Sequence, residues 1–301
     1  MTRRLHHHSL NVSNAERSLE FYVNQLGMLI VGHTKGLGPE PDRYHLSFGG
    51  AGDSRLELLC DRRESPVGYQ HDDGDLYWKT NITVPDLEAA RERLYFRGVQ
   101  VSEPVQFADV GYMCHLKDPD GYIIELLQHT FGRNQQPPEP DPDLLLGSQP
   151  TLAHITLRCM NPAVSIPFYR DLLGMRLMSR QHINERGFTL YFLAYTDEVT
   201  PSEDINSVQD REWLWQRPYT MIELQHIRRS EDTVLEYRTD EDGPYGFRGV
   251  TIFAADRPEL FRRTKGFNFT VESPESGYLE PGKPLILRDP DGTQIRIVDQ
   301  E

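Results

Sequence analysis

Cysteine is scarce in this chain of 301 residues, which contains only Cys60, Cys114 and Cys159. These three are scattered and form neither a disulfide framework nor a zinc-binding spacing, so the sequence predicts a protein of the reducing cytoplasm. No apolar run approaches the roughly 18 residues that a transmembrane helix needs. The N-terminal segment lacks the apolar core of a signal peptide, and none is expected.

Positive charge is also in short supply. The chain has 32 lysines and arginines against 46 aspartates and glutamates, a formal net charge of −14. Phosphate groups repel such a chain, which argues against nucleic acid and anionic membranes as partners. The remaining composition, with 38% hydrophobic and 26% charged residues, is ordinary for a globular protein. Its length predicts about two domains, and a small molecule is the expected partner.

One short sequence occurs in both halves of the chain. FYVNQLGM (Phe21–Met28) returns 147 residues later as FYRDLLGM (Phe168–Met175), and His7 returns at the same offset as His154. Before each copy, alternating apolar and polar residues predict a half-buried strand. A capping residue and a helix that ends at glycine follow the strand. The chain is therefore an internal duplication.

Each half divides further into two βαβββ units. The sequence Asp-Pro-Asp-Gly occurs at 118–121 and 289–292. It is typical of a type I turn and joins the last two strands of the second and fourth units. The predicted fold is α+β, with four units in two tandem pairs. Residues 131–150 are rich in proline and predict a linker between an N-terminal domain, 1–130, and a C-terminal domain, 151–301.

These motifs together resemble one family. The repeated FYxxxLGM sequence, the central Leu56-Glu57-Leu58 and Ile222-Glu223-Leu224 strands and the DPDG turns are similar to those of the vicinal oxygen chelate superfamily. This superfamily includes glyoxalase I, bleomycin and fosfomycin resistance proteins and extradiol dioxygenases. The third unit most resembles glyoxalase I, through LYFLAY (Leu190–Tyr195) and WLWQRPYTMIEL (Trp213–Leu224). The resemblance implies paired units that form cup-shaped mixed sheets.

The resemblance also implies one ligand position on the first strand and one on the last strand of each unit. In chain order these positions hold His7 and Glu57, Lys79 and Glu125, His154 and Glu223, and Gly249 and Arg296. The fourth unit therefore offers no metal ligand. A catalytic divalent metal needs about three protein ligands and an open position. Imidazole and carboxylate suit zinc, nickel, iron, cobalt or manganese.

The pairing of the units decides which cup is complete. We expect the glyoxalase-like pairing, in which the second and third units collect His154, Glu223 and Glu125 as metal ligands. The first and fourth units would then collect only a second candidate pair, His7 and Glu57. In a dioxygenase-like pairing, the first and second units would share one cup and combine their ligands.

Three basic residues leave alternatives open. Lys79 can form an ion pair with Glu125 in a site without metal, or burial and a nearby metal can lower its pKa and make it a proton-transfer group or an anchor for an anionic substrate. Arg296 is expected to form a salt bridge with Glu57 in place of a metal. Arg158 occupies the place where glyoxalase I carries an arginine for a glutathione carboxylate, and it can equally form a surface ion pair.

Other histidines are expected to be structural. His6 and His8 flank His7 on its strand, so alternation should turn both away from the cup. His115 is likewise assigned a structural role.

Three functions follow from the resemblance. The first is a metal-dependent lyase or isomerase of glyoxalase I type, in which the metal holds adjacent substrate oxygens and stabilises an enediolate. Glu125 would move the proton, and glutathione is a candidate co-substrate. The second is a metal-free or degenerate small-molecule-binding protein. The third, an extradiol-type dioxygenase, is disfavoured because Gly249 and Arg296 remove ligands that it needs. A monomer or a homodimer is expected, since four units can complete their cups within one chain.

Overall fold

The computed structural model describes residues 3–38, 40–50, 54–60, 69–72, 74–134, 144–228, 246–266, 270–273 and 279–299. The first unit contains β1 (Arg3–Val12), α1 (Ala15–Leu19), the π-helical turn η1 (Glu20–Gln25), β2 (Leu29–Thr34), β3 (Asp42–Ser47) and β4 (Arg55–Cys60). The second contains β5 (Tyr77–Val84), α2 (Leu87–Phe96), β6 (Val105–Phe107), β7 (Gly111–Lys117) and β8 (Ile123–Gln128), followed by the short 3₁₀ turn η2 (Gly132–Asn134).

The second half repeats this order. The third unit contains β9 (Thr151–Arg158), α3 (Pro162–Pro167), η3 (Phe168–Leu172), β10 (Arg176–Ile183), η4 (Asn184–Arg186), β11 (Phe188–Ala194), α4 (Gln209–Leu214) and β12 (Met221–Ile227). The fourth contains β13 (Gly246–Ala254), α5 (Arg257–Thr264), β14 (Val271–Ser273), β15 (Leu285–Arg288) and β16 (Gln294–Val298). The predicted α+β fold with four βαβββ units is confirmed.

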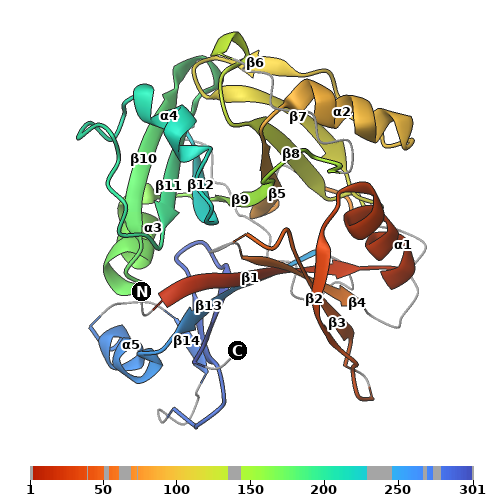
Figure 1. The fold of residues 1–301 in the computed structure, drawn as a ribbon. Helices are drawn as coiled ribbons and strands as arrows, with labels where there is room; N and C mark the ends of the chain where they lie inside the picture. The colour runs from red at the N-terminus through yellow and green to blue at the C-terminus, as the bar shows by residue number, and fades with distance from the viewer. Residues whose placement is uncertain are drawn as a thin grey trace.

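Two curled eight-stranded sheets hold these units (Figure 1). One sheet has the order β14-β15-β16-β13-β1-β4-β3-β2, and the other has the order β10-β11-β12-β9-β5-β8-β7-β6. The antiparallel pairs β1–β13 and β5–β9 join the units. The first unit therefore pairs with the fourth and the second with the third, so the expected glyoxalase-like pairing is confirmed. We call these cup 1/4 and cup 2/3.

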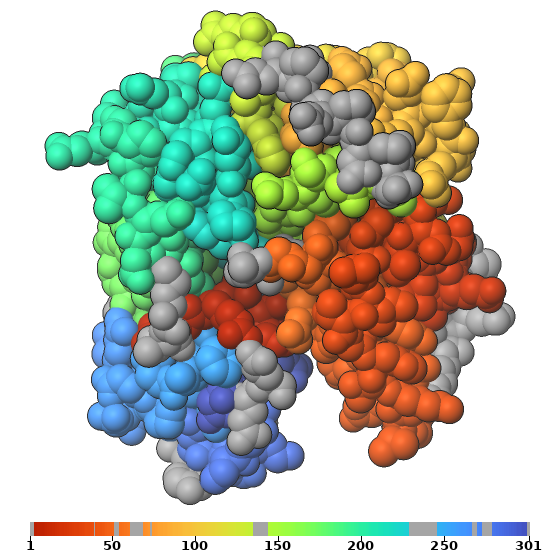
Figure 2. Space-filling view, in the orientation of Figure 1, coloured from red at the N-terminus to blue at the C-terminus, as the bar shows by residue number. Residues whose placement is uncertain are grey.

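Each half of the chain thus contributes one unit to each cup. The space-filling view shows the first and fourth units together below the second and third (Figure 2). The expected limits 1–130 and 151–301 divide the chain into its two halves, but each sheet contains strands from both halves. Residues 135–143 of the expected linker lie outside the described residues, whereas Leu146 is buried in the main hydrophobic core.

The repeated FYxxxLGM motif forms the end of the first helical segment in each half. Phe21, Tyr22, Leu26 and Met28 are all buried. Gly27 and Gly174 both have a φ of +82°, a left-handed conformation that only glycine adopts at little cost, so the helical segment ends there in both copies.

The two motifs that identified the repeat contact each other. The hydroxyl of Tyr22 donates to Asp118 Oδ2 at 2.9 Å, and that of Tyr169 donates to Asp289 Oδ2 at 2.7 Å. Both acceptors begin an Asp-Pro-Asp-Gly turn. The tyrosine belongs to one cup and the turn to the other, so these hydrogen bonds hold the two sheets together at equivalent places.

The segment Thr196–Gln216, between β11 and β12 of the third unit, contains α4. Its last turn positions Trp215, which is buried and donates from Nε1 to the carbonyl oxygen of Val110 at 3.0 Å. Within the described part of the chain, no helix is long and apolar enough to cross a membrane. The three cysteines are buried and free.

Candidate active site

Cup 2/3 contains a cavity of about 240 Å³. Its walls are mainly aromatic and aliphatic side chains from the second and third units: Trp78, Phe107, Val110, Met113, Leu127, Phe188, Leu190, Phe192 and Trp215. Its polar lining consists of Lys79, His115, Glu125, His154, Arg186 and Glu223. A mostly apolar cavity with a few convergent polar groups is typical of a site for a small molecule.

Glu125 lies at the centre of the polar groups. It is buried on β8 and forms an ion pair with Nζ of Lys79 on β5. Asn81 Nδ2 donates to its Oε1 at 2.9 Å, and Nε2 of His115 lies 2.9 Å from its Oε2. Burial alone would raise the pKa of Glu125, but the charge of Lys79 and the contact with His115 outweigh burial and hold it well below its usual range. The carboxylate is therefore ionised at neutral pH.

His154 lies between two carboxylates. Its Nε2 is 2.8 Å from Glu223 Oε2 and 3.9 Å from Glu125 Oε1. Thr156, two residues along β9, donates to Glu223 Oε2 at 3.0 Å and helps to orient that carboxylate. The His154 ring packs against Trp215, with ring centroids 5.8 Å apart.

These three donors can be tested against a metal site. Two ligands about 2.1 Å from one tetrahedral ion lie roughly 3.4 Å apart. The distances from His154 Nε2 to Glu223 and Glu125, 2.8 and 3.9 Å, bracket this value. An imidazole with two carboxylates suits a divalent transition metal, so His154, Glu223 and Glu125 fit one in type. Their ligand atoms do not all lie within 4.8 Å of one another, so one carboxylate would have to move towards the other to share an ion. Lys79 competes for one oxygen of Glu125.

Lys79 was expected either to form an ion pair with Glu125 in a site without metal or to act on the substrate. The ion pair with Glu125 is present, and Nζ also lies 4.3 Å from the ring centroid of Trp78. Both the lysine and the glutamate are buried and line the cavity. The structure therefore places the ammonium group beside any small molecule in the cavity.

Arg158 is buried on β9 rather than exposed at the surface. Its Nη1 donates to the carbonyl oxygens of Asp72 and Asp75, at 3.2 and 3.0 Å. It is absent from the residues that line the cavity. Its assignment as a substrate-binding residue stays a prediction.

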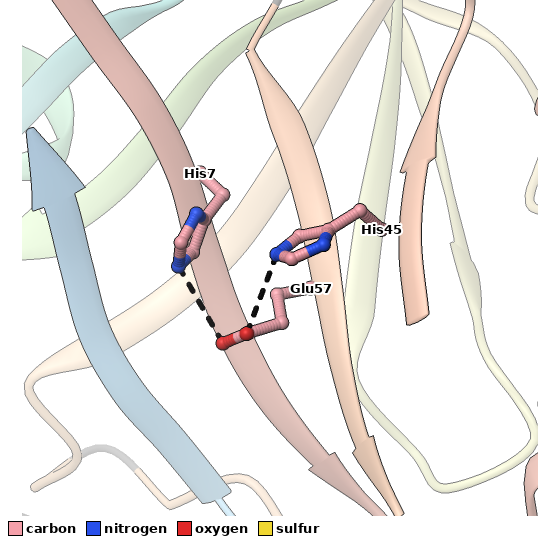
Figure 3. Close-up of side chains that lie close together, drawn as sticks. All are labelled: His7, His45 and Glu57. Carbon is pink, nitrogen blue, oxygen red and sulfur yellow. Dashed lines mark ion pairs between the residues drawn. The ribbon is translucent and has the colours of Figure 1, made fainter. Parts of the chain in front are cut away.

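Cup 1/4 has a second cluster of potential ligands (Figure 3). His7 Nε2 lies 3.5 Å from Glu57 Oε2, as the family positions predict. His45 on β3 joins them, with Nε2 3.3 Å from Glu57 Oε1. One ligand atom from each of the three residues lies within 4.8 Å of the other two. Burial lowers the pKa of His7 to about 3, so its imidazole is neutral at neutral pH.

The arginine that pairs with Glu57 is Arg43, not Arg296. Arg43 Nη1 lies 3.2 Å from Glu57 Oε1. In the described part of the chain Arg296 forms no ion pair, so the predicted salt bridge between Arg296 and Glu57 is wrong. Burial and the nearby charge of Arg43 lower the pKa of Arg296.

The expectation that His6 faces away from the cup is also wrong. The pairing of β1 with β13 is irregular between Leu5 and His7, where a bulge interrupts the alternation of side chains. His6 Nδ1 consequently lies 2.6 Å from His7 Nδ1. His8 does face the other way, where its Nε2 lies 2.9 Å from Thr80 Oγ1.

Motif matching missed both His45 and His115, and cross-strand pairing could have identified them. His45 is the register partner of Glu57, and His115 is the register partner of Glu125. Directly opposed residues in antiparallel strands have neighbouring side chains on one face. His115 is therefore a neighbour of the candidate site and not simply a structural residue, as the sequence had suggested.

Comparison with known proteins agrees with this architecture. The family model for the glyoxalase/bleomycin resistance protein/dioxygenase superfamily matches residues 4–126. Lactoylglutathione lyase of Neisseria meningitidis is 33% identical over 43% of this chain and 93% of the relative. This chain belongs to that superfamily.

Two further proteins match this chain over almost its whole length. Glyoxalase I of Saccharomyces cerevisiae is 25% identical over 98% of this chain and 91% of its own. The crystal structure of glyoxalase I from Zea mays superposes with a TM-score of 0.71 at 21% identity, covering 99% of this chain and 92% of that one. The latter likeness concerns the fold alone.

Proposed function

We propose that this chain is a metal-dependent lyase of glyoxalase I type that acts in cup 2/3 on a small substrate with adjacent oxygens. The observation that carries the proposal is that His154, Glu223 and Glu125, from two units, line one apolar cavity, with His154 Nε2 within 3.9 Å of both carboxylates. The curated relatives named above support the same reaction class.

A divalent metal would be held by His154, Glu223 and Glu125, and when bound it would supply Lewis-acid stabilisation of negative charge on the substrate oxygens. Lys79 and His115 keep the Glu125 carboxylate unprotonated at neutral pH, as a base must be, and the same contacts lower its pKa and so weaken it as a base. Glu125 would take the proton from one of the two oxygen-bearing carbons and return it to the other.

The cavity walls determine what else the substrate can contact. Phe192 and Trp215 are buried around His154 and exclude water from the reacting atoms. Arg186 lines the same cavity from an exposed position, where it can receive a substrate carboxylate. Lactoylglutathione, the compound in the name of the Neisseria relative, has a thioester carbonyl beside a hydroxyl-bearing carbon and carries carboxylates. Glutathione is thus the proposed co-substrate.

The experiment uses protein made without a histidine tag and loaded with zinc, nickel, iron, cobalt or manganese in turn. The thioester absorbance of lactoylglutathione follows the reaction. We expect turnover with at least one metal, and a fall in kcat of about 100-fold or more in Glu125→Gln, the range for loss of a general base. Glu198→Gln, a change at a partly exposed glutamate outside the cavity, is the matched control. Absence of turnover with every metal would refute the proposal.

A second function, metal-free binding of a small molecule, is favoured by one observation. Glu125 already has an ion pair with Lys79 and hydrogen-bonding contacts with Asn81 and His115, so it needs no metal to balance its charge. Trp78 and Trp215 line the cavity and can report binding by fluorescence. Saturable quenching by a ligand in the presence of a chelator, with no turnover under any metal, would support this function instead.

A further inference from the structure

We propose that cup 1/4 holds a second divalent-metal site, in which His45 replaces the ligands that the fourth unit lacks. The ligands are His7, His45 and Glu57, from the neighbouring strands β1, β3 and β4 (Figure 3). The inference concerns a different cup from the proposed lyase site and does not depend on it.

The spacing of the three groups carries the proposal. His7 Nε2 and His45 Nε2 lie 3.5 and 3.3 Å from different oxygens of Glu57. Both distances match the roughly 3.4 Å between two ligands of one tetrahedral ion. Nε2 of His45 is shielded from solvent and has no hydrogen-bond partner of good geometry, although buried polar atoms almost always have one. A metal ion would give this nitrogen a partner.

Neighbouring side chains orient the ligands as metal sites require. Nδ1 of His7 lies 2.6 Å from His6 Nδ1, so the opposite ring nitrogen faces Glu57. The hydroxyl of Ser9 donates to Glu57 Oε2 at 2.6 Å. Partners of this kind, on the far nitrogen of a histidine and on a ligating carboxylate, fix ring and carboxylate positions around bound metals.

The chemistry of the donor set indicates the class of ion. Two imidazoles and one carboxylate suit zinc, cobalt, nickel or ferrous iron, and three protein ligands leave at least one position open. Arg43 opposes binding, because its guanidinium holds one oxygen of Glu57. Arg43→Gln should therefore tighten metal binding, which a purely structural histidine cluster would not show.

The test measures Co²⁺ bound to the tag-free full-length chain by equilibrium dialysis and by visible absorption. The Glu223→Gln background removes a ligand of cup 2/3, so the remaining ion reports cup 1/4. We expect about one equivalent in this background. We expect His7→Ala or His45→Ala to weaken binding at least tenfold. His33→Ala is the matched control, since His33 is an exposed histidine on β2 that stacks on Tyr44.

Thermal denaturation of each variant shows whether its sheet is intact. His45→Gln, which keeps the size and polarity of the side chain, provides a second variant if His45→Ala does not fold. Absence of bound Co²⁺ in the Glu223→Gln background would refute the site. Equal losses in His33→Ala and His45→Ala would refute it as well, as would a loss in His7→Ala with none in His45→Ala or His45→Gln.

Discussion

Replacement of Lys79 by methionine tests how the buried carboxylate of Glu125 is stabilised. The two side chains form an ion pair in which the lysine is 5% and the glutamate 2% exposed. Methionine fills a similar volume without a charge, so the variant leaves Glu125 in the same place without its ammonium partner. Asn81 and His115 still contact the carboxylate.

The magnitude follows from this arrangement. Removal of one partner of a buried ion pair costs about 3–5 kcal/mol of folding free energy. Because two contacts to Glu125 remain, we expect the low end, about 3 kcal/mol. Replacement of both charges at once is often neutral, since no buried charge is left without compensation. The double variant Lys79→Met with Glu125→Gln should therefore regain most of the lost stability.

The pH dependence adds a second signature. In the wild type the pKa of Glu125 is lowered, so its contribution is present above the unfolded value of about 4.3 and is lost as pH falls below it. Without Lys79, burial should raise the pKa of Glu125, and this variant should lose stability as pH rises. The difference between the two proteins should grow from pH 4 to pH 7.

Urea denaturation at several pH values measures these quantities. A cost below about 1 kcal/mol for Lys79→Met at pH 7 would contradict the reasoning, because that is the value of an exposed pair. A double variant no more stable than the single variant would also contradict it. In that case Lys79 would stabilise the fold through contacts other than its ion pair with Glu125.

Three further predictions concern the cavity and both cups. Trp215→Ala should cost about 3–5 kcal/mol in thermal denaturation, because a fully buried indole is removed; a cost under 1 kcal/mol would mean that the wall is not packed. Arg186→Ala should raise KM for a carboxylate-bearing substrate several-fold with little change in kcat, whereas an unchanged KM would exclude carboxylate binding there. The lowered pKa values of Glu57 and Glu125 predict that the urea midpoint falls from pH 5 to pH 3; a constant midpoint would disagree.

Much of the fold could be predicted because its sequence motifs occur in both halves of the chain. The FYxxxLGM repeat and the two Asp-Pro-Asp-Gly turns located the four units, and the structure shows why both motifs recur. Tyr22 and Tyr169 donate to Asp118 and Asp289, so each motif provides the other with a buried partner. The pairing of the units followed from the family resemblance rather than from any local pattern.

The candidate site was less predictable, for physical reasons. The position of His45 beside Glu57 depends on the register between β3 and β4, which no sequence motif indicates. His6 depends on a bulge that breaks the alternation of β1. Trp215 belongs to the motif WLWQRPYTMIEL, which indicated the family but not that this indole would line the cavity. The charges of Arg296 and Glu57 do interact, but the ion pair with Glu57 is formed by Arg43.

The most direct test of the account compares metal content and lactoylglutathione turnover in the wild type, Glu223→Gln and Glu198→Gln. Glu223 accepts from Thr156 and contacts His154, so its loss should remove one equivalent of metal and abolish turnover together. Glu198→Gln should match the wild type in both measurements. Full turnover by Glu223→Gln, or by wild-type protein freed of metal by a chelator, would contradict the central claim.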